Sequence, residues 1–450
     1  MAVWTSIQLS AIRSGFRIDS EFYKQEYIQK DHDLLKLKCS SLGHLAKVTD
    51  GEHGSVKFVS SGIKYLTAEN IKQGYVDFEN VRFVGLEVDQ RNARASVNVG
   101  DVLISIKGTL GEVGVAETQL LPANMNRDVA IIKPFLFAPS GHYISAFLRS
   151  SYGAYQLARE GSGGVQQMIT LERLRGIKVP LISNFGVNLV TCEYKQAQIK
   201  RQESIDLYTQ AQKLLESEMG LDQLSFDKPV GYTAHFSEME LSRRFDSEHY
   251  YPAFDKLKEN LPEHVQLVPL SSVLTFCQRG KQPIYLSSGL PVLNSKHILE
   301  NKITLEGNRL AKPNPAPSLQ IQYGDVLING TGRGTIGRAA PYLVSEHQAV
   351  PDNHVTILRS STLDPAYLSF YLNSLAGKLQ VEKYQRGSSG QLELYPFDIR
   401  KFQVWEAPQY IQQEIRRLYD QASESARQSR KLLDQARARV EQLIEEAVQA

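Results

Sequence analysis

The chain has 450 residues, of which 42% are hydrophobic and 22% are charged, so it is long enough to form two cores of ordinary domain size. Its formal net charge is only +2. A protein that grips nucleic acid without help usually carries a larger basic excess. Either this chain does not bind nucleic acid, or a partner supplies most of the contact with the phosphate backbone.

The composition also argues against several classes of protein. No run approaches the roughly 18 apolar residues of a membrane-spanning helix, and the first twenty residues lack the charged start and apolar block of a secretion signal. We therefore expect a cytoplasmic protein. Cys39, Cys192 and Cys277 lie far apart without C-x-x-C spacing, which argues against a zinc site and against a disulfide scaffold.

From the N-terminus onward, the chain contains one ordered set of segments twice. Residues 17–23 (RIDSEFY) return as 244–250 (RFDSEHY), and 65–71 (YLTAENI) return as 292–298 (VLNSKHI), in both cases 227 positions later. Residues 100–104 (GDVLI) return as 324–328. So long a displacement excludes short-period repeats of about 20 to 50 residues. It predicts two copies of one module.

A glycine-rich turn follows the last of these segments in both copies, as GTLG at 108–111 and GTIG at 334–337. In the second copy, residues 332–337 also fit the dinucleotide-binding pattern G-x-G-x-x-G, with Asp352 about twenty residues later. We reject a dinucleotide fold because Pro341 stands where the phosphate-binding helix should run, and the first copy lacks the pattern. The glycines instead predict a β-turn that needs positive φ.

Each copy ends in a Gly- and Ser-rich segment, a short apolar strand and a long polar helix. The Gly- and Ser-rich segments are 161–164 and 387–390, and the strands are 177–182 and 402–405. In the second helix, apolar or small residues recur in steps of three and four, which predicts a heptad seam broken only at Arg439. The seam residues are Ile415, Leu418, Ala422, Ser425, Ser429, Leu432, Ala436 and Leu443.

The first helix is expected from about Cys192 to Met219, with a less regular apolar stripe. That stripe contains Ile199, Ile205, Ala211, Leu214 and Leu215. Two such helices in one chain can pair as an antiparallel coiled coil; the alternative is two separate amphipathic helices, each lying on its own domain. A helix of about 28 residues spans about 42 Å, close to the roughly 34 to 36 Å of one DNA turn.

The sequence shows no catalytic constellation. It lacks the N-P-P-Y motif of amino-methyltransferases, a Walker motif, an H-E-x-x-H motif and the acidic and lysine residues of a nuclease site after Asp352. We therefore expect a protein that recognises its target and is not itself an enzyme.

Taken together, these features resemble the specificity (S) subunits of type I restriction-modification systems over nearly the whole chain. The resemblance is carried by the two RxDSExY openings, the two GDVLI strands with their glycine turns, the Gly- and Ser-rich tails, and the helix entry at 407–415 (APQYIQQEI). That entry is similar to the family's Pro-x-x-x-Gln-x-x-Ile signature. The first copy departs from it, because an insertion containing Asn-Phe-Gly separates Pro180 from Gln196 and Ile199.

The resemblance implies an α+β fold with two tandem target-recognition domains of mixed α/β structure, separated by two long helices that form an antiparallel coiled coil. We expect the first domain at 1–190, a central spacer helix at 191–220, a linker and the second domain at 221–405, and a C-terminal spacer helix at 406–450. In this family each domain reads one half of a split, asymmetric site in double-stranded DNA. Two methyltransferase subunits dock on the helices, and a restriction/translocase subunit joins for cleavage.

No cofactor is expected in this chain; the resemblance places S-adenosylmethionine in the methyltransferase partner. Basic and polar side chains in loops of both modules are candidates for base readout, because Arg and Lys can address guanine and Asn can address adenine. They are Lys57, Ser60, Ser61, Lys72, Lys107, Asn126 and Arg127 in the first copy, and Arg279, Lys281, Lys296, His297, Arg333, Arg338 and Asn353 in the second. Candidates for partner docking on the helices are Ile199, Leu214, Ile415, Leu418 and Leu432.

Three alternatives stay open. The first is a sequence-reading subunit of another DNA modification or phage-defence complex built from the same modules. The second, from a different class, is a coiled-coil scaffold that binds protein and not DNA. The third, a hydrolytic enzyme, has only the glycine loop to support it.

Overall fold

The computed structural model describes residues 20–79, 81–161, 167–226, 231–305, 307–314, 316–343, 348–387 and 392–449. The start of the first repeated segment, 17–19, and most of both Gly- and Ser-rich tails lie outside these ranges. The chain forms two compact units: the first comprises Met1–Gln202 with Ser425–Ala450, and the second comprises Glu203–Glu424. Both boundaries fall inside long helices, α8 (Asn184–Glu218) and α15 (Gln409–Gln449).

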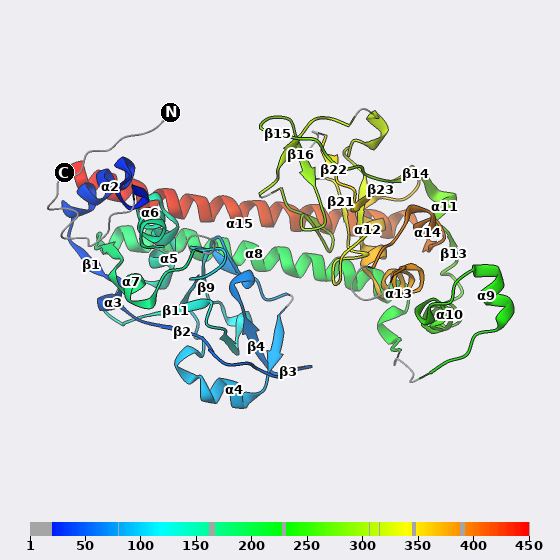
Figure 1. Cartoon of the computed structure of the whole chain (residues 1–450), viewed down its shortest axis with the longest axis horizontal. Helices are drawn as coiled ribbons and strands as arrows, with labels where there is room; N and C mark the ends of the chain where they lie inside the picture. The colour runs from blue at the N-terminus through cyan, green and yellow to red at the C-terminus, as the bar shows by residue number, and fades with distance from the viewer. Residues whose placement is uncertain are drawn as a thin grey trace. The chain divides into compact units, whose positions relative to one another are not determined.

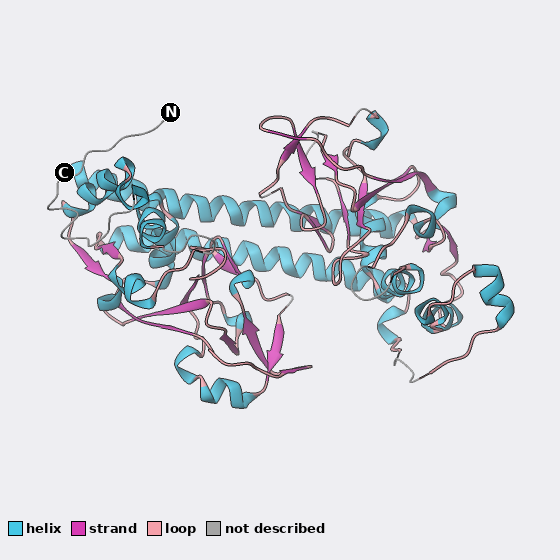
Figure 2. Ribbon diagram, viewed as in Figure 1, coloured by secondary structure: helices cyan, strands magenta, loops and turns pink. Residues whose placement is uncertain are grey.

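A four-stranded antiparallel sheet is the centre of the first unit (Figure 2). Its order is β2 (Ala46–Asp50), β11 (Val129–Pro134), β8 (Val102–Ser105) and β9 (Val113–Val115). Val102 and Ile104 point to one core and Leu103 to another, because successive side chains of a strand alternate between faces. Burial on both faces explains why the GDVLI segment is continuously apolar after its aspartate.

One face of this sheet packs on α5 (Gly141–Arg149), and α6 (Ser151–Glu160) packs in turn against α5. The other faces a smaller sheet of order β10 (Ala123–Met125), β4 (Ile63–Leu66), β7 (Arg82–Val84) and β3 (Phe58–Val59), in which β10 and β4 are parallel. Two short pairs complete the strands: β5 (Ile71–Lys72) with β6 (Tyr75–Val76), and β1 (Cys39–Ser41) with β12 (Lys178–Pro180). The remaining helical elements are η1 (Ser20–Tyr23), α2 (Gln25–Leu35), α3 (Leu42–Leu45), η2 (Ala68–Asn70), α4 (Leu86–Arg91), η3 (Ala93–Ala95), η4 (Thr118–Leu120) and α7 (Leu171–Gly176).

The second unit repeats this topology strand for strand. Its larger sheet has the order β14 (Leu274–Arg279), β23 (Val355–Ser360), β20 (Val326–Asn329) and β21 (Ala339–Pro341). Its smaller sheet has the order β22 (Val350–Pro351), β16 (Leu290–Leu293), β19 (Leu310–Ala311) and β15 (Tyr285–Leu286), again with one parallel pair. The prediction of two copies of one module is confirmed.

Two short strand pairs also recur: β17 (Ile298–Leu299) with β18 (Lys302–Ile303), and β13 (Leu267–Pro269) with β24 (Gln403–Trp405). Helices α12 (Pro365–Asn373) and α13 (Leu375–Tyr384) correspond to α5 and α6. The other helical elements are η5 (Leu221–Gln223), α9 (Phe236–Ser242), η6 (Ser247–Tyr250), α10 (Ala253–Glu259), α11 (Leu270–Val273), η7 (Pro317–Leu319) and α14 (Pro396–Ile399).

The repeated Gly-Asp motif has a structural role in both units. The buried carboxylate of Asp101 lies 2.8 Å from the Lys133 ammonium, and that of Asp325 lies 2.6 Å from Nε of Arg359. Each aspartate also accepts a hydrogen bond from the backbone N–H three residues before it. The motif therefore ties the start of one central strand to its neighbour, because a buried carboxylate must be paired.

The long helices pair in antiparallel fashion within each unit (Figure 1). In the first unit, Oγ of Ser429 donates to the carbonyl of Ala197 at 2.7 Å, and Nη2 of Arg439 lies 3.2 Å from Oε1 of Glu193. In the second unit, the hydroxyls of Tyr208 and Ser423 are 3.1 Å apart. The predicted antiparallel pair is confirmed, and the alternative of two unpaired helices is not. None of the described helices is long and apolar enough to cross a membrane.

The buried stripe of α15 differs from the predicted seam in its second half. Ile411, Ala422, Leu433 and Ile444 are all buried and are spaced by 11 residues. An 11-residue repeat keeps a stripe on one face of a nearly straight helix, whereas a heptad would drift. After Ser429 the stripe therefore passes through Leu433, Ala436 and Val440. Predicted Leu432 and Leu443 flank it half-buried, and Arg439 does not interrupt it.

Helix α8 begins at Asn184, eight residues before the predicted start at Cys192. The Asn-Phe-Gly segment looked like an insertion but forms the first turn of the helix. A Cβ at Gly186 would lie only 3.0 Å from side-chain atoms of Ile182 and Leu443, so close packing on α15 favours glycine there despite its low helix propensity. The buried face of α8 contains Val190, Tyr194, Ala197, Ala211 and Leu215.

Candidate nucleic-acid interface

Three loops leave the same end of the larger sheet in the first unit. The register pairs Asp50, at the end of β2, with Ala130, and Ser105, at the end of β8, with Val129. The loops that follow β2 and β8 therefore emerge beside the loop that precedes β11. We call this end of the sheet the loop end.

Backbone hydrogen bonds tie the three loops together. The N–H of Arg127 donates to the carbonyl of Glu52 at 3.0 Å, and the N–H of Ile106 donates to that of Asp128 at 2.9 Å. Three of the predicted DNA-contacting residues, Lys107, Asn126 and Arg127, are brought together at the loop end by these bonds.

The second unit has the same loop end. Gly280, after β14, donates its N–H to Val355, and Gly330, after β20, donates to His354, at 2.9 and 2.7 Å. Predicted residues Lys281, Arg333 and Asn353 lie in these loops. Asn353 occupies the place of Arg127, since each stands two residues before the strand in the middle of its sheet.

The glycine turns adopt positive φ in both units, as predicted: Gly108 and Gly111 have φ of 86° and 87°, and Gly332 and Gly337 have φ of 98° and 82°. Each turn is closed by the N–H of its last glycine, which donates to the carbonyl of Ser105 or Asn329 at 3.0 or 2.8 Å. The second turn is two residues longer between these closing partners, and the longer turn carries Arg333. Gly108 lies three residues after Ser105, and Gly332 lies three residues after Asn329, so these two glycines correspond. Alignment of GTLG with GTIG in the sequence would instead pair Gly108 with Gly334.

The exposure of the predicted residues falls into three groups. Seven are exposed: Lys57, Ser60, Ser61, Arg127, Lys281, Lys296 and Arg333. Six are half-buried: Lys72, Lys107, Asn126, Arg279, Arg338 and Asn353. His297 is buried.

His297 differs from the other predicted residues because its side chain is buried and bonded locally. Its side chain is 2% exposed, and its Nδ1 accepts a hydrogen bond from the backbone N–H of Asn294 at 3.1 Å. Burial lowers the pKa of His297 to about 4, so the ring is neutral. In the first unit, Oδ1 of Asn70 accepts the corresponding hydrogen bond from the backbone N–H of Thr67 at 2.9 Å. At this repeated position the side chain therefore caps the backbone three residues before it.

Two further predicted residues use their polar groups inside the protein. Nη2 of Arg279 donates to the carbonyl of Gly330 at 3.2 Å, and Nη1 lies 3.4 Å from Oε2 of Glu393, so this arginine holds the loop end in place. The amide of Asn126 donates to Oδ2 of Asp128 at 2.9 Å, in a tight turn of its own. In the structure, both half-buried side chains therefore bind within the loop end.

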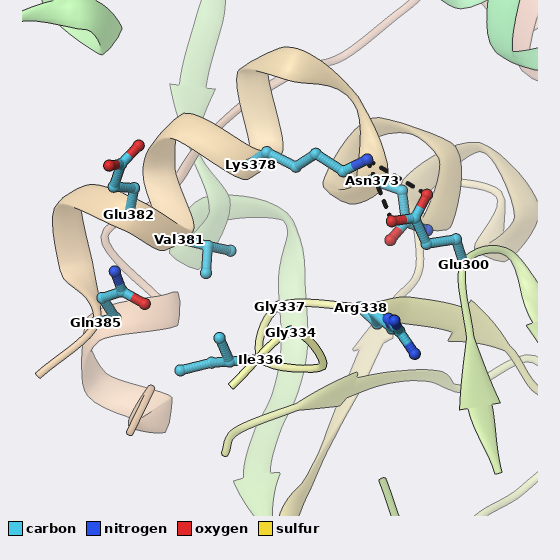
Figure 3. A pocket seen from close by; sticks show the side chains of 10 residues that line it. All are labelled: Glu300, Gly334, Ile336, Gly337, Arg338, Asn373, Lys378, Val381, Glu382 and Gln385. Carbon is cyan, nitrogen blue, oxygen red and sulfur yellow. Dashed lines mark hydrogen bonds and ion pairs between the residues drawn. The ribbon is translucent and has the colours of Figure 1, made fainter. Parts of the chain in front are cut away.

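The longer glycine turn also forms one wall of a cavity of about 310 Å³ against α13 (Figure 3). Ile336 faces Val381 across it, and an ion pair of 3.2 Å between Lys378 and Glu300 lies at its edge. Its lining carries charges of both signs, with no nucleophile and general base side by side. Across the described ranges, no group of three or more His, Cys, Asp or Glu residues could hold a metal ion.

The predicted set omits one pair of basic residues at matching positions in the two smaller sheets. The guanidinium of Arg82 lies over the ring of Phe58 at 3.9 Å, and that of Arg309 lies over the ring of Tyr285 at 3.4 Å. Both partners are displaced by the 227 residues that separate the repeated segments. The sequence signal for this pair is the repeat of FVSSG at 58–62 as YLSSG at 285–289.

Comparisons with known proteins support the resemblance found in the sequence. No protein-family model matches the chain. It is similar to the specificity subunit of the type I restriction enzyme EcoBI from Escherichia coli, with 26% identity over 125 residues. The match covers 28% of this chain and 26% of that protein, so it spans about a quarter of the relative's length.

Among solved structures, an S subunit of a type I restriction-modification system from M. genitalium matches with a TM-score of 0.37 and 11% identity, over 91% of this chain and 95% of that one. The HsdS subunit from Thermoanaerobacter tengcongensis matches with a TM-score of 0.30 and 14% identity, over 91% and 96% of the two chains. The sequence match, over about a quarter of each protein, makes the chain similar to a protein of the specificity-subunit class, the subunit from EcoBI.

Proposed function

We propose that the chain is the DNA sequence-specificity subunit of a type I restriction-modification complex and has no catalytic activity of its own. The main support is the pair of loop ends, which have one backbone framework but different side chains. Lys107 and Thr331 each form the same isolated bridge beside the glycine turn, and Arg127 and Asn353 occupy one position before a central strand. One framework with two sets of donors and acceptors suits two different base sequences.

The proposed target is accordingly a bipartite, asymmetric site in double-stranded DNA, in which each module reads one block in the major groove. The partners are two methyltransferase subunits, which bind S-adenosylmethionine, and a restriction/translocase subunit. The near-neutral charge of the chain fits this division of labour, because the partners then supply much of the contact with the phosphates.

The structure sorts the five proposed partner-docking residues by their exposure. Ile415 and Leu418 are buried in the core of the second unit. Leu214 and Leu432 are half-buried against the two cores. Ile199 is 65% exposed on α8, which supports its proposed role in docking a partner.

Methylome sequencing tests the proposal directly. A host that carries this chain with its accompanying methyltransferase genes should show one methylated motif of two short unequal blocks separated by unread base pairs. Deletion of this chain alone should abolish methylation at the motif. Methylation that persists without the chain, or a motif that forms one uninterrupted block, would contradict the proposal.

DNA retention by purified protein separates the alternatives. The chain together with its methyltransferase should retain the motif-bearing duplex, while the chain alone should bind it weakly at physiological salt, because it can neutralise few phosphates. A complex that is assembled but retains no DNA would favour the protein-binding scaffold. Retention without any methylated motif in the host would favour another type of defence complex.

A further inference from the structure

The stacked arginines occupy equivalent places on an edge of the two smaller sheets. β3 and β15 are the edge strands, and they carry Phe58 and Tyr285. The register pairs Phe58 with Val84 and Tyr285 with Ala311, so each arginine lies two residues before the partner of the aromatic residue. Such a diagonal neighbour across two strands is within reach of a long side chain. The stacking is therefore built into the strand register of both modules.

A Ser-Ser-Gly turn follows the aromatic residue in each module. Gly62 and Gly289 have φ of 147° and 144°, and a Cβ there would lie 2.6 or 2.3 Å from a carbonyl oxygen of the adjoining strand. Only glycine allows this close approach, so the turn is held at the same point in both copies. Continued by one step, the strand register places the first serine opposite the arginine. The four serines of these turns are exposed.

The two guanidinium groups are available to a ligand. Arg82 and Arg309 are exposed, and in the part of the chain that the structure describes neither forms an ion pair with a carboxylate. Stacking on a ring restrains the planar guanidinium while its N–H edges stay open, so less conformational freedom is lost on binding. The serine hydroxyls are further donors beside it.

We propose that each stacked arginine with its Ser-Ser-Gly turn is a phosphate-binding element that grips the DNA sugar-phosphate backbone beside the half-site read by that module. This proposal rests on the proposed function. A positive charge and several N–H and O–H donors, with no carboxylate of the described residues paired to the guanidinium, suit a phosphodiester. Because both modules carry the same element, it cannot distinguish two different base sequences; contacts to the backbone position a protein without specifying sequence.

Salt-dependent binding by the assembled complex tests the proposal. The full chain, with its methyltransferase subunits, is prepared as wild type, Arg82→Ala, Arg309→Ala and the double variant. Affinity is measured for a duplex that carries the methylated motif and for a scrambled duplex, between roughly 50 and 200 mM salt. Each single variant should weaken binding to both duplexes by about tenfold. The slope of log affinity against log salt should fall by about 0.9 for each arginine, and the methylated motif should not change.

Matched controls separate the stacked site from general charge and from folding. Lys36→Ala and Lys256→Ala remove one exposed positive charge from each unit, away from the smaller sheets, and should leave the slope unchanged. Tyr285→Phe copies the aromatic residue of the first module and should bind as wild type does. Arg82→Lys keeps the charge without the planar stack and should bind with intermediate affinity, which supplies a second reading if the alanine variant unfolds.

Three outcomes would overturn the proposal. Wild-type affinity and slope in the double variant would mean that the arginines do not contact DNA. A changed base preference in one half-site would make the arginine a reader of bases and not of phosphates. Equal losses in the lysine controls would mean that only net charge matters. If the wild-type complex itself retains no DNA, the proposed function fails, which is a different result from failure of this element alone.

Discussion

The two larger sheets and the loops at their ends follow different rules. The sheets have the same strand order, and each fixes its central strands with a buried aspartate paired to a basic residue. The glycine turns at the loop end share their closing hydrogen bond but differ in length, and only the longer turn carries an arginine. Packing constrains the buried strands to repeat, whereas exposed turns tolerate additions. This contrast indicates which positions are free to diverge between the modules.

A second contrast lies just after β9 and β21, which are equivalent edge strands of the two larger sheets. Glu117 and Leu343 each stand two residues after that strand, so the first unit holds a carboxyl group where the second holds a leucine. Burial raises the pKa of Glu117 to about 7, although Arg201 and the amide of Gln198 on α8 oppose the shift. Ionisation of Glu117 therefore costs stability in the first unit, whereas the second unit has no ionisable group at this position.

Lengthening the helix pair is expected to have the largest effect, because it changes the whole recognised site. Four residues are inserted after Gln202 in α8 and four after Glu424 in α15, at the boundaries of the two units, so that the antiparallel contacts within each unit are kept. Each helix gains about 6 Å, or roughly two base pairs. If the pair sets the distance between modules, methylome sequencing should show both blocks unchanged and a longer unread spacer.

The matched control is the insertion in α8 alone. It shifts α8 by about one turn against α15 and should reduce assembly with the methyltransferase. An unchanged motif length in a paired-insertion complex that remains assembled would mean that the helices do not set the spacing.

Removal of the buried aspartates should destabilise both units. Asp325→Ala leaves Arg359 without the partner that it contacts at 2.6 and 3.1 Å, and loss of one member of a buried pair costs about 3–5 kcal/mol. Asp101→Ala should cost less, because the ammonium of Lys133 contacts this carboxylate only once, at 2.8 Å, and keeps its hydrogen bond to the carbonyl of Ser96. Urea unfolding of the full chain measures both effects. The exposed Glu259→Ala serves as control, and equal midpoints for all three variants would refute the structural role of the motif.

The stability effect of Glu117 should depend on pH. Its pKa is higher in the folded chain than in the unfolded chain, so the favourable contribution of the protonated form is complete below about pH 4.5 and is lost as the pH rises through about 7. Glu117→Leu, which copies the second unit, should gain up to about 3 kcal/mol relative to wild type between pH 5 and pH 8. Urea unfolding at both pH values measures the gain. A constant difference, or the same pH dependence in the exposed Glu172→Leu control, would exclude the shifted carboxyl group.

Exchange of the loop-end residues should have the smallest energetic effect, but it addresses recognition directly. Arg127→Asn and Asn353→Arg exchange the side chains found at one shared position, and each should alter a single block of the methylated motif. A good base contact discriminates by about 1–3 kcal/mol. Methylome sequencing of each variant reports the altered position, with Lys36→Ala as an exposed control. Alteration of both blocks by one substitution would show that the modules do not read independently.

Much of the fold could be predicted, because a sequence that repeats in fixed order indicates that the same strand topology occurs twice. Segments that recur in fixed order must occupy equivalent places, and the strand orders agree with that expectation. The helix start at Asn184 could not be predicted, because the fit of Gly186 against Leu443 depends on a helix more than 200 residues away in the sequence. The low helix propensity of glycine argues against a helix at this point, but packing of Gly186 against α15 outweighs it.

The candidate site was less predictable than the fold, because residue type does not reveal what a side chain contacts. His297 and Arg279 have suitable chemistry for DNA, but one is a buried cap and the other binds a loop carbonyl. Arg82 and Arg309 were missed for the opposite reason. Their stacking depends on which residues face each other across two strands, and that register is set by sheet pairing and not by spacing along the chain.

The division of the units inside the long helices affects how the protein is made. Leu433, Ala436, Val440 and Ile444 of α15 belong to the same core as Val190, Tyr194 and Ala197 of the first unit. A ribosome that has finished residues 20–202 has therefore not yet made a wall of the first core, whereas residues 203–424 already contain every segment of the second unit. The part of the chain that is synthesised first is the last to be completed. Until then the apolar residues of α8 that pack on α15 lack that partner, and exposed apolar surface of this kind favours aggregation.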